Sequence, residues 1–189
     1  SEFYDNTMKH KATKLTNHMG LPTLVSYDAD HIGQKTKRGQ LSDPWVLWKK
    51  HRKENLEARK ILHYGLIAMA FVLLGYIGRQ REDWVVTALS GLMAISVVEL
   101  TCYYFTFFIL LAPFVLRNFW QGFLILLTPI LTQVLYLAPA WNDVRYVRET
   151  ALLYFVFLLV AALEAWQVFQ ERRGQNSDPI EADSPVGST

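Results

Sequence analysis

Four long apolar runs constrain what this 189-residue chain can fold into more than any other feature. Charged residues make up only 19% of the chain, and they gather in blocks between the runs. A soluble domain would spread its charges along amphipathic elements, whereas a helix that crosses a bilayer needs about 20 consecutive apolar residues. The sequence therefore predicts an all-α integral membrane protein with about four transmembrane helices, over residues 61–78, 84–116, 119–141 and 149–170.

The run over 84–116 is too long for one ordinary span. A continuous helix there would extend roughly 50 Å, against about 30 Å of hydrocarbon. We expect a single helix that ends at Pro113 and whose last turn leaves the bilayer. The alternative is a break near residues 99–101, which would give a re-entrant hairpin or a fifth span.

Polar segments flank the apolar runs. Residues 1–41 are expected to form an extramembrane segment, with a β-prone run over 23–27. Residues 42–60 are expected to form a basic amphipathic helix beside the membrane, because Pro44 suits a first helical turn. Residues 172–189 are poor in apolar side chains, so we expect a disordered tail.

Trp45 and Trp48 precede a run of basic residues in the helix expected over 42–60. This combination is typical of a helix that lies at the level of the lipid headgroups. The alternative is an ordinary solvated helix that leads into the first span. We expect membrane lipids, and not nucleic acid, as partners, with headgroup contacts from Trp45, Trp48, Lys49, Lys50, Arg52 and Lys53.

Basic residues near the span ends predict the orientation of the chain. With four spans, the cluster between Lys49 and Lys60 shares one side of the membrane with Arg117, Arg172 and Arg173, and we expect that side to be cytoplasmic. The C-terminal tail would then be cytoplasmic, whereas five spans would place it outside. The expected location is the cytoplasmic membrane of a bacterium, in a multi-pass protein.

Two carboxylates interrupt the apolar runs. In a four-span topology the helices that carry them run in the same direction, and both acids lie at similar depth. Neighbouring desolvated carboxylates titrate as a coupled pair, which suits them to hold a proton or a cation. The alternatives are a hydrogen bond across a helix interface and a contact to a polar substrate. The candidate intramembrane polar site comprises Glu99, Thr101, Tyr103, Tyr104 and Glu164.

Motifs for other chemistry are absent from the sequence. Its His and Asp residues fit no closed zinc pattern, and it contains no Gly-rich phosphate loop and no nucleophile elbow. We therefore expect no metal and no cofactor.

The stretches EFYDNTMKHKATKLTNHMGLPT, DPWVLWKKHRKE and VELTCYYF resemble the C-terminal membrane portion of large uncharacterised bacterial polytopic proteins. More broadly, the chain is similar to multi-spanning glycosyltransferases of the GT-C type, which use lipid-linked sugars. The resemblance implies that an N-terminal part of the same protein is a partner. In the GT-C class the catalytic acid lies in an early extracytoplasmic loop. No residue of this chain matches it, so the catalytic residues stay unknown.

Three functions follow from these features. The first is a scaffold or the lining of a substrate cavity in a larger membrane protein, which the resemblance suggests is a lipid-linked-sugar transferase. The second is a transporter or ion-coupled module that uses Glu99 and Glu164. The third is a structural membrane anchor. Whether the protein is an enzyme stays open.

Overall fold

The computed structural model describes the backbone of residues 15–175 and all side chains in that range except those of residues 102–105 and 175. Residues 172–175 of the tail expected to be disordered are helical, and the rest of that tail lies outside the described range, as does part of the segment expected over 1–41. The described chain is mostly helical. Its elements are β1 (His18–Met19), α2 (Leu21–Val25), α3 (Gly33–Thr36), α4 (Val46–Ala58), α5 (Lys60–Gly78), α6 (Asp83–Leu89), α7 (Gly91–Val97), β2 (Leu100–Thr101), the 3₁₀-helix η1 (Cys102–Leu116), α8 (Phe119–Leu137) and α9 (Asn142–Gln175).

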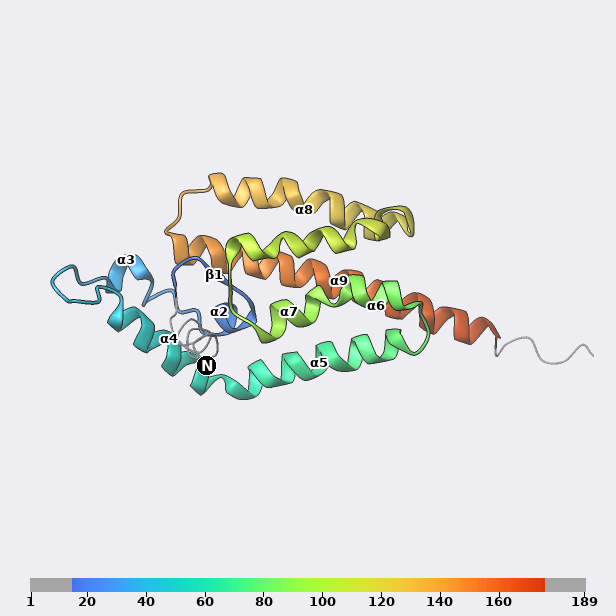
Figure 1. The fold of residues 1–189 in the computed structure, drawn as a ribbon, viewed down its shortest axis with the longest axis horizontal. Coiled ribbons are helices and arrows are strands. Elements are labelled where there is room, and N and C mark those ends of the chain that lie inside the picture. Colours follow the sequence, from blue (N-terminus) through green and yellow to red (C-terminus); the bar gives the residue numbers. More distant parts are fainter. Residues whose placement is uncertain (1–14, 176–189) are drawn as a thin grey trace, which may run out of the picture.

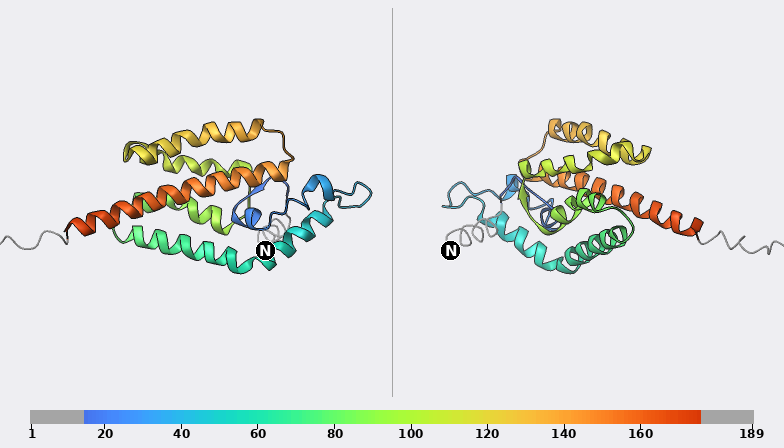
Figure 2. Two further views of the ribbon diagram at one scale, coloured as in Figure 1. Left: turned by 180° about the vertical axis from the view of Figure 1, so that it is seen from behind. Right: turned by 45° about the vertical axis from the view of Figure 1, so that its right-hand side comes forward.

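The long elements form a bundle in which the chain reverses direction at every turn (Figure 1). Helix α5 leads away from the N-terminal segment, α6 and α7 return, η1 leads away again, α8 returns and α9 leads away (Figure 1). Two further views agree on this arrangement (Figure 2). The start and the end of the described chain therefore lie at opposite ends of the bundle.

Within residues 15–175, three helices are long and apolar enough to cross a membrane, namely α5, α8 and α9. Helices α5 and α8 have 19 residues each, so each is about 28 Å long. The expectation of a largely helical chain with membrane-length apolar helices is confirmed. The structure has three such helices where the sequence predicted four, because the run over 84–116 does not form one of them.

The single helix expected over 84–116 is wrong, and the chain breaks where the alternative placed the break. Helix α7 ends before Val98, whose backbone is extended with φ −113° and ψ 150°. The next residues form β2, which pairs with β1 in an antiparallel register that places Thr101 opposite His18. Pro113 lies inside η1 and does not end it. The pairing gives Leu100 and Thr101 a backbone partner outside a helix.

The elements before α5 form a polar lobe, defined here as residues 15–59, at one end of the bundle (Figure 1). The β-prone run over 23–27 lies partly in α2, which is helical and not a strand. Gly20 joins β1 to α2 with φ +127°, and a Cβ at this position would lie 2.3 Å from the carbonyl oxygen of Val98. Only glycine fits this conformation and this close approach.

Packing inside the bundle is tight between α7, η1 and α9. Leu92 and Ile95 of α7, Phe114 of η1 and Phe157 of α9 are all fully buried in one apolar core. Helix α8 crosses η1 at Gly122, where a Cβ would lie 2.6 Å from the carbonyl oxygen of Val115. The core thus fixes the positions of both bundle ends, where the polar side chains gather.

Candidate functional site

Glu164 is the centre of a buried ionic cluster at the end of the bundle away from the lobe. Its side chain is 0% exposed on α9. Oε1 accepts hydrogen bonds from Arg81 Nε at 2.5 Å and from Arg117 Nη2 at 2.9 Å, and Oε2 accepts one from Gln121 Nε2 at 3.2 Å. Arg81 lies in the α5–α6 turn and Arg117 in the η1–α8 turn, so one carboxylate connects α9 to both turns.

A second layer of charge surrounds this cluster. Arg81 donates from Nη1 and Nη2 to the two carboxylate oxygens of Glu171, both at 2.8 Å. These hydrogen bonds, together with those to Glu164, raise the pKa of Arg81 above its ordinary value. The guanidinium of Arg117 lies 5.4 Å from the ring centroid of Trp84. Such a network of paired charges is better suited to hold α9 against the two turns than to bind and release a proton.

Glu99 lies at the lobe end of the bundle, in the segment between α7 and η1. It accepts a hydrogen bond from Thr23 Oγ1 at 2.9 Å. Thr101 belongs to β2, and the side chains of Tyr103 and Tyr104 lie outside those that the structure describes. The carboxylate of Glu99 therefore contacts the lobe and lies at one end of the bundle.

The structure does not bring Glu99 and Glu164 together. Gly20, whose added Cβ would lie 3.4 Å from the Cα of Glu99, donates from its amide to Thr150 Oγ1 on α9. Thr150 and Glu164 are 14 positions apart, which is about 21 Å along a helix. The expected carboxylate pair required one helix over 84–116, and the break in that run places Glu99 at the opposite end from Glu164.

Asp143, which nothing in the sequence marks as a contact residue, attaches the lobe to the bundle. It is 2% exposed in the first turn of α9. Its Oδ2 accepts hydrogen bonds from the amide of Gly33 at 2.7 Å and from Trp48 Nε1 at 2.9 Å. An acid in the first turn of a helix ordinarily indicates only a favourable interaction with the helix dipole, so the sequence carries no signal for this contact.

Arg52 is a second attachment point, on the same helix as Trp48. Its side chain is 4% exposed, and Nη1 donates to the carbonyl oxygen of Thr23 at 2.5 Å and to Ser26 Oγ at 3.1 Å. Burial lowers the pKa of Arg52 below its ordinary value. Trp48 and Arg52 thus point into the lobe and not out from its surface, and the headgroup contacts expected of them stay a prediction.

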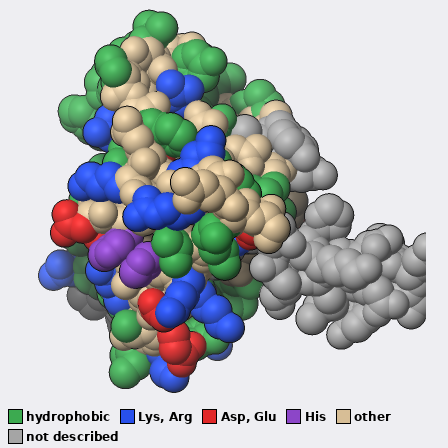
Figure 3. Space-filling view, turned by 90° about the vertical axis from the view of Figure 1, so that its left-hand side faces the viewer, with side chains coloured by type: hydrophobic (Ala, Val, Ile, Leu, Met, Phe, Trp, Pro, Cys, Tyr) green, Lys and Arg blue, Asp and Glu red, His purple; other side chains and the backbone are tan. Residues whose placement is uncertain are grey.

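The other expected headgroup residues lie at or near the surface of the lobe end. Lys50 and Lys53 are exposed, Trp45 is half-buried, and Lys49 donates to Asp43 Oδ2 at 2.9 Å. Figure 3 looks onto this end of the molecule and shows Lys and Arg side chains spread across it, with fewer acidic side chains between them.

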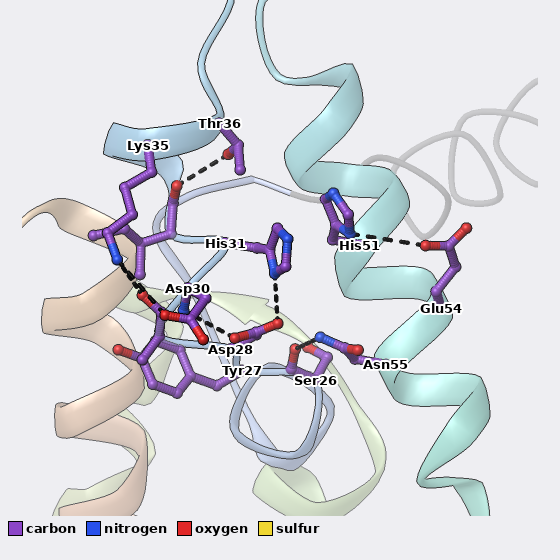
Figure 4. Close-up of polar contacts among 12 residues, drawn as sticks. Ser26, Tyr27, Asp28, Asp30, His31, Lys35, Thr36, His51, Glu54 and Asn55 are labelled. Carbon is purple, nitrogen blue, oxygen red and sulfur yellow. Dashed lines mark hydrogen bonds and ion pairs between the residues drawn. The ribbon is translucent and has the colours of Figure 1, made fainter.

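A pair of histidines lies on the lobe surface between the segment after α2 and helix α4 (Figure 4). The rings of His31 and His51 stack with centroids 3.9 Å apart. His31 Nδ1 lies 2.7 Å from Asp28 Oδ2, and His51 Nδ1 lies 3.8 Å from Glu54 Oε2. The hydrogen bond with His31 lowers the pKa of Asp28 to about 2. Within residues 15–175, no group of three or more His, Cys, Asp or Glu side chains is arranged to hold a metal ion.

A cavity of about 390 Å³ lies between the lobe and the first turns of α9. Its walls combine aromatic rings with amide, hydroxyl and ammonium groups. The polar and aromatic residues that line it include Asn17, Trp45, Trp48, Lys49, Asn142 and Tyr146. Three of the side chains expected at lipid headgroups therefore share one cavity with residues of α9 that the sequence analysis did not single out.

No family model, curated protein or solved structure matches the chain. The resemblance to GT-C glycosyltransferases thus stays a prediction. The geometry of the two bundle ends and of the faces between them is the basis for assigning a function.

Proposed function

We propose that the chain is a membrane-embedded scaffold that crosses the bilayer five times and holds the polar lobe at one membrane surface. The observation that carries this proposal is the division of the surface into three zones. Charged side chains gather at the two ends of the bundle, and large apolar side chains are exposed between them. Examples are Val72 on α5, 73% exposed, Ile109 on η1, 72% exposed, and Ile130 on α8, 60% exposed.

The spacing of the charged ends fits a bilayer. Asn142 and Glu164 mark the two ends on α9 and are 22 positions apart, which is about 33 Å of helix. The hydrocarbon core of a bilayer is about 30 Å thick. η1 has 15 residues, and at about 2.0 Å per residue it also extends roughly 30 Å. The shorter α6–α7 segment is largely buried among its neighbours, which favours a crossing shielded from lipid.

The distribution of basic residues supports a cytoplasmic lobe. With five crossings, Arg145 and Arg148 join the basic cluster of the lobe, whereas Arg117 moves to the other side. Arg172 and Arg173 lie on that opposite side too, so the end of α9 is outside. The four-span topology placed it in the cytoplasm.

The environment of the two acids supports a scaffold over an ion-coupled transporter. Glu164 is neutralised by two guanidinium groups, and Glu99 lies at the far end from it and accepts a hydrogen bond from Thr23. To bind a transported cation, a carboxylate paired with two arginines would first have to break both ion pairs. The same contacts connect separate chain segments, which is the role of a scaffold.

Spin labels in lipid nanodiscs test the membrane assignment. Single cysteines at Val72 and Ile130, with Cys102 replaced by serine, should give labels accessible to oxygen and protected from a water-soluble nickel relaxant. A label at the exposed Lys53 of the lobe is the matched control and should show the reverse pattern. Equal nickel access at Val72, Ile130 and Lys53 would contradict a membrane-embedded bundle.

A further inference from the structure

The cavity between the lobe and α9 is rich in hydrogen-bond donors. Lys49 contributes an ammonium group, Asn17 and Asn142 contribute carboxamides, and Tyr146 contributes a hydroxyl. An ammonium group has three N–H donors, and Lys49 uses one of them on Asp43, which leaves two for a ligand. Donors of this kind around one cavity suit the oxygens of a phosphate group.

We propose that this cavity binds the phosphodiester headgroup of one membrane phospholipid. The inference rests on the proposed membrane function, because it needs the cavity at the bilayer surface. Asn142 begins α9 and Lys60 begins α5, so the cavity lies where two proposed spans leave the hydrocarbon on the lobe side. Phospholipid phosphates occupy that level of a membrane.

The aromatic wall of the cavity suits the glycerol part of the same lipid. The rings of Trp45 and Trp48 pack edge to face, with centroids 6.5 Å apart. Trp48 is held in place by its hydrogen bond to Asp143, so this wall is formed before a ligand arrives. Trp and Tyr side chains are enriched at membrane interfaces because they combine an apolar ring with one polar atom.

The charges around the cavity favour an anion. The ammonium group of Lys37 lies 5.3 Å from the ring centroid of Trp45, and the guanidinium of Arg52 lies 5.3 Å from that of Trp48. Two acids lie nearby, and both have partners. Asp43 accepts from Lys49 and from the amide of Trp45, whereas Asp143 accepts from Gly33 and Trp48.

Native mass spectrometry of the full chain in a detergent without phosphate tests the proposal. Phosphatidylglycerol should be retained at one molecule per chain, and diacylglycerol, which has the same glycerol and acyl groups without phosphate, should not. Displacement of the lipid by excess inorganic phosphate would assign the affinity to the phosphate group alone, and resistance to displacement would assign it to the whole headgroup. Equal retention of diacylglycerol would overturn the proposal.

Two variants locate the binding and one controls for folding. Lys49→Ala and Asn142→Leu should each weaken retention of phosphatidylglycerol at least tenfold. Asp43→Asn removes the same ion pair as Lys49→Ala but leaves the ammonium group in the cavity, so its retention should equal or exceed that of the unmodified chain. Unchanged retention in both cavity variants, or an equal loss in Asp43→Asn, would overturn the proposed site. Failure of this test with Val72 and Ile130 still facing lipid would leave the scaffold function intact.

Discussion

Arg117 Nη2 donates a hydrogen bond at 2.9 Å to Oε1 of Glu164, although the two residues are 47 positions apart in the chain. Glu164 is fully buried, and Arg81 donates to the same oxygen. This single carboxylate therefore joins the α5–α6 turn, the η1–α8 turn and α9 at the far end of the bundle. At the lobe end, Asp143 joins α9 to α3 and α4 in the same way.

Replacing Glu164 tests whether the far-end cluster fastens the bundle. Glu164→Gln should lower the free energy of unfolding by about 3–5 kcal/mol, because the buried carboxylate that Arg81 and Arg117 share is then uncharged, and only Arg81 keeps a close second partner, Glu171. The matched control is Glu171→Gln, since Glu171 also pairs with Arg81 but is 57% exposed, and we expect a loss of at most about 1 kcal/mol. Denaturant unfolding in detergent micelles measures both. Equal losses in the two variants would contradict the fastening role of Glu164.

Trp48→Phe tests the attachment of the lobe. The variant keeps an aromatic ring in place but removes the N–H group that Asp143 accepts, so the lobe should loosen by about 1–3 kcal/mol. Hydrogen exchange should then accelerate in α3 and α4 and stay unchanged at the far end of α9. Trp166→Phe, at a tryptophan that is 58% exposed on α9, is the control and should leave exchange in the lobe unaltered. Slow exchange in the lobe of Trp48→Phe would argue against this attachment.

Gly20→Ala should disrupt the pairing of β1 with β2. Alanine disfavours φ +127°, and its Cβ would lie 2.3 Å from the carbonyl oxygen of Val98. The strain alone costs about 1–3 kcal/mol, and we expect lower thermal stability together with faster amide exchange at residues 18–19 and 100–101. Gly39→Ala is the control, because nothing lies within 4 Å of the added Cβ. If both variants unfold at the same temperature, the close approach of Gly20 does not constrain the fold.

The contact between Asp28 and His31 predicts how the lobe responds to acid. The pKa of Asp28 is lowered from 3.8 to about 2, chiefly by the hydrogen bond with His31. Because the folded state has the lower pKa, the contribution of this carboxylate to stability is present above pH 3.8 and is lost as the pH falls towards 2. The carboxyl carbon of Asp28, followed by NMR, should titrate near pH 2, and His31→Asn should move the midpoint upwards. A midpoint near 3.8 in the unmodified chain would contradict the contact.

The helical class and the membrane-length helices could be predicted from sequence because both depend on local composition. A run of apolar residues such as 61–78 needs no knowledge of its neighbours to be identified as a candidate span. The break after Val97 was harder to predict, because it depends on β1, which lies about 80 positions earlier in the chain and supplies the strand partner. From the residues around Glu99 alone, the break could be predicted only as an alternative to a continuous helix.

The roles of individual polar residues were predictable only in part. The sequence places Glu164 with Glu99 in a candidate intramembrane polar site and Arg117 on the lobe side, whereas Glu164 pairs with Arg81 and Arg117 at the other end of the bundle. Trp48 and Arg52 are residue types typical of contacts with lipid headgroups. Only the fold of the lobe directs their side chains inwards. The sequence did not indicate the contacts of Asp143, because a single acid at the start of a helix has many ordinary explanations. Side-chain direction in each case depends on contacts between segments distant in the chain.

Cysteine labelling from the two sides of the membrane tests the five-crossing topology most directly. With Cys102 replaced by serine, single cysteines are placed at Lys53 in the lobe and at Gln170 near the end of α9, both of which are exposed. An impermeant maleimide added to intact spheroplasts should label Gln170→Cys at once and Lys53→Cys only after the membrane is broken. Labelling of both cysteines from the same side would contradict five crossings and, with them, the opposite placement of the two charged ends.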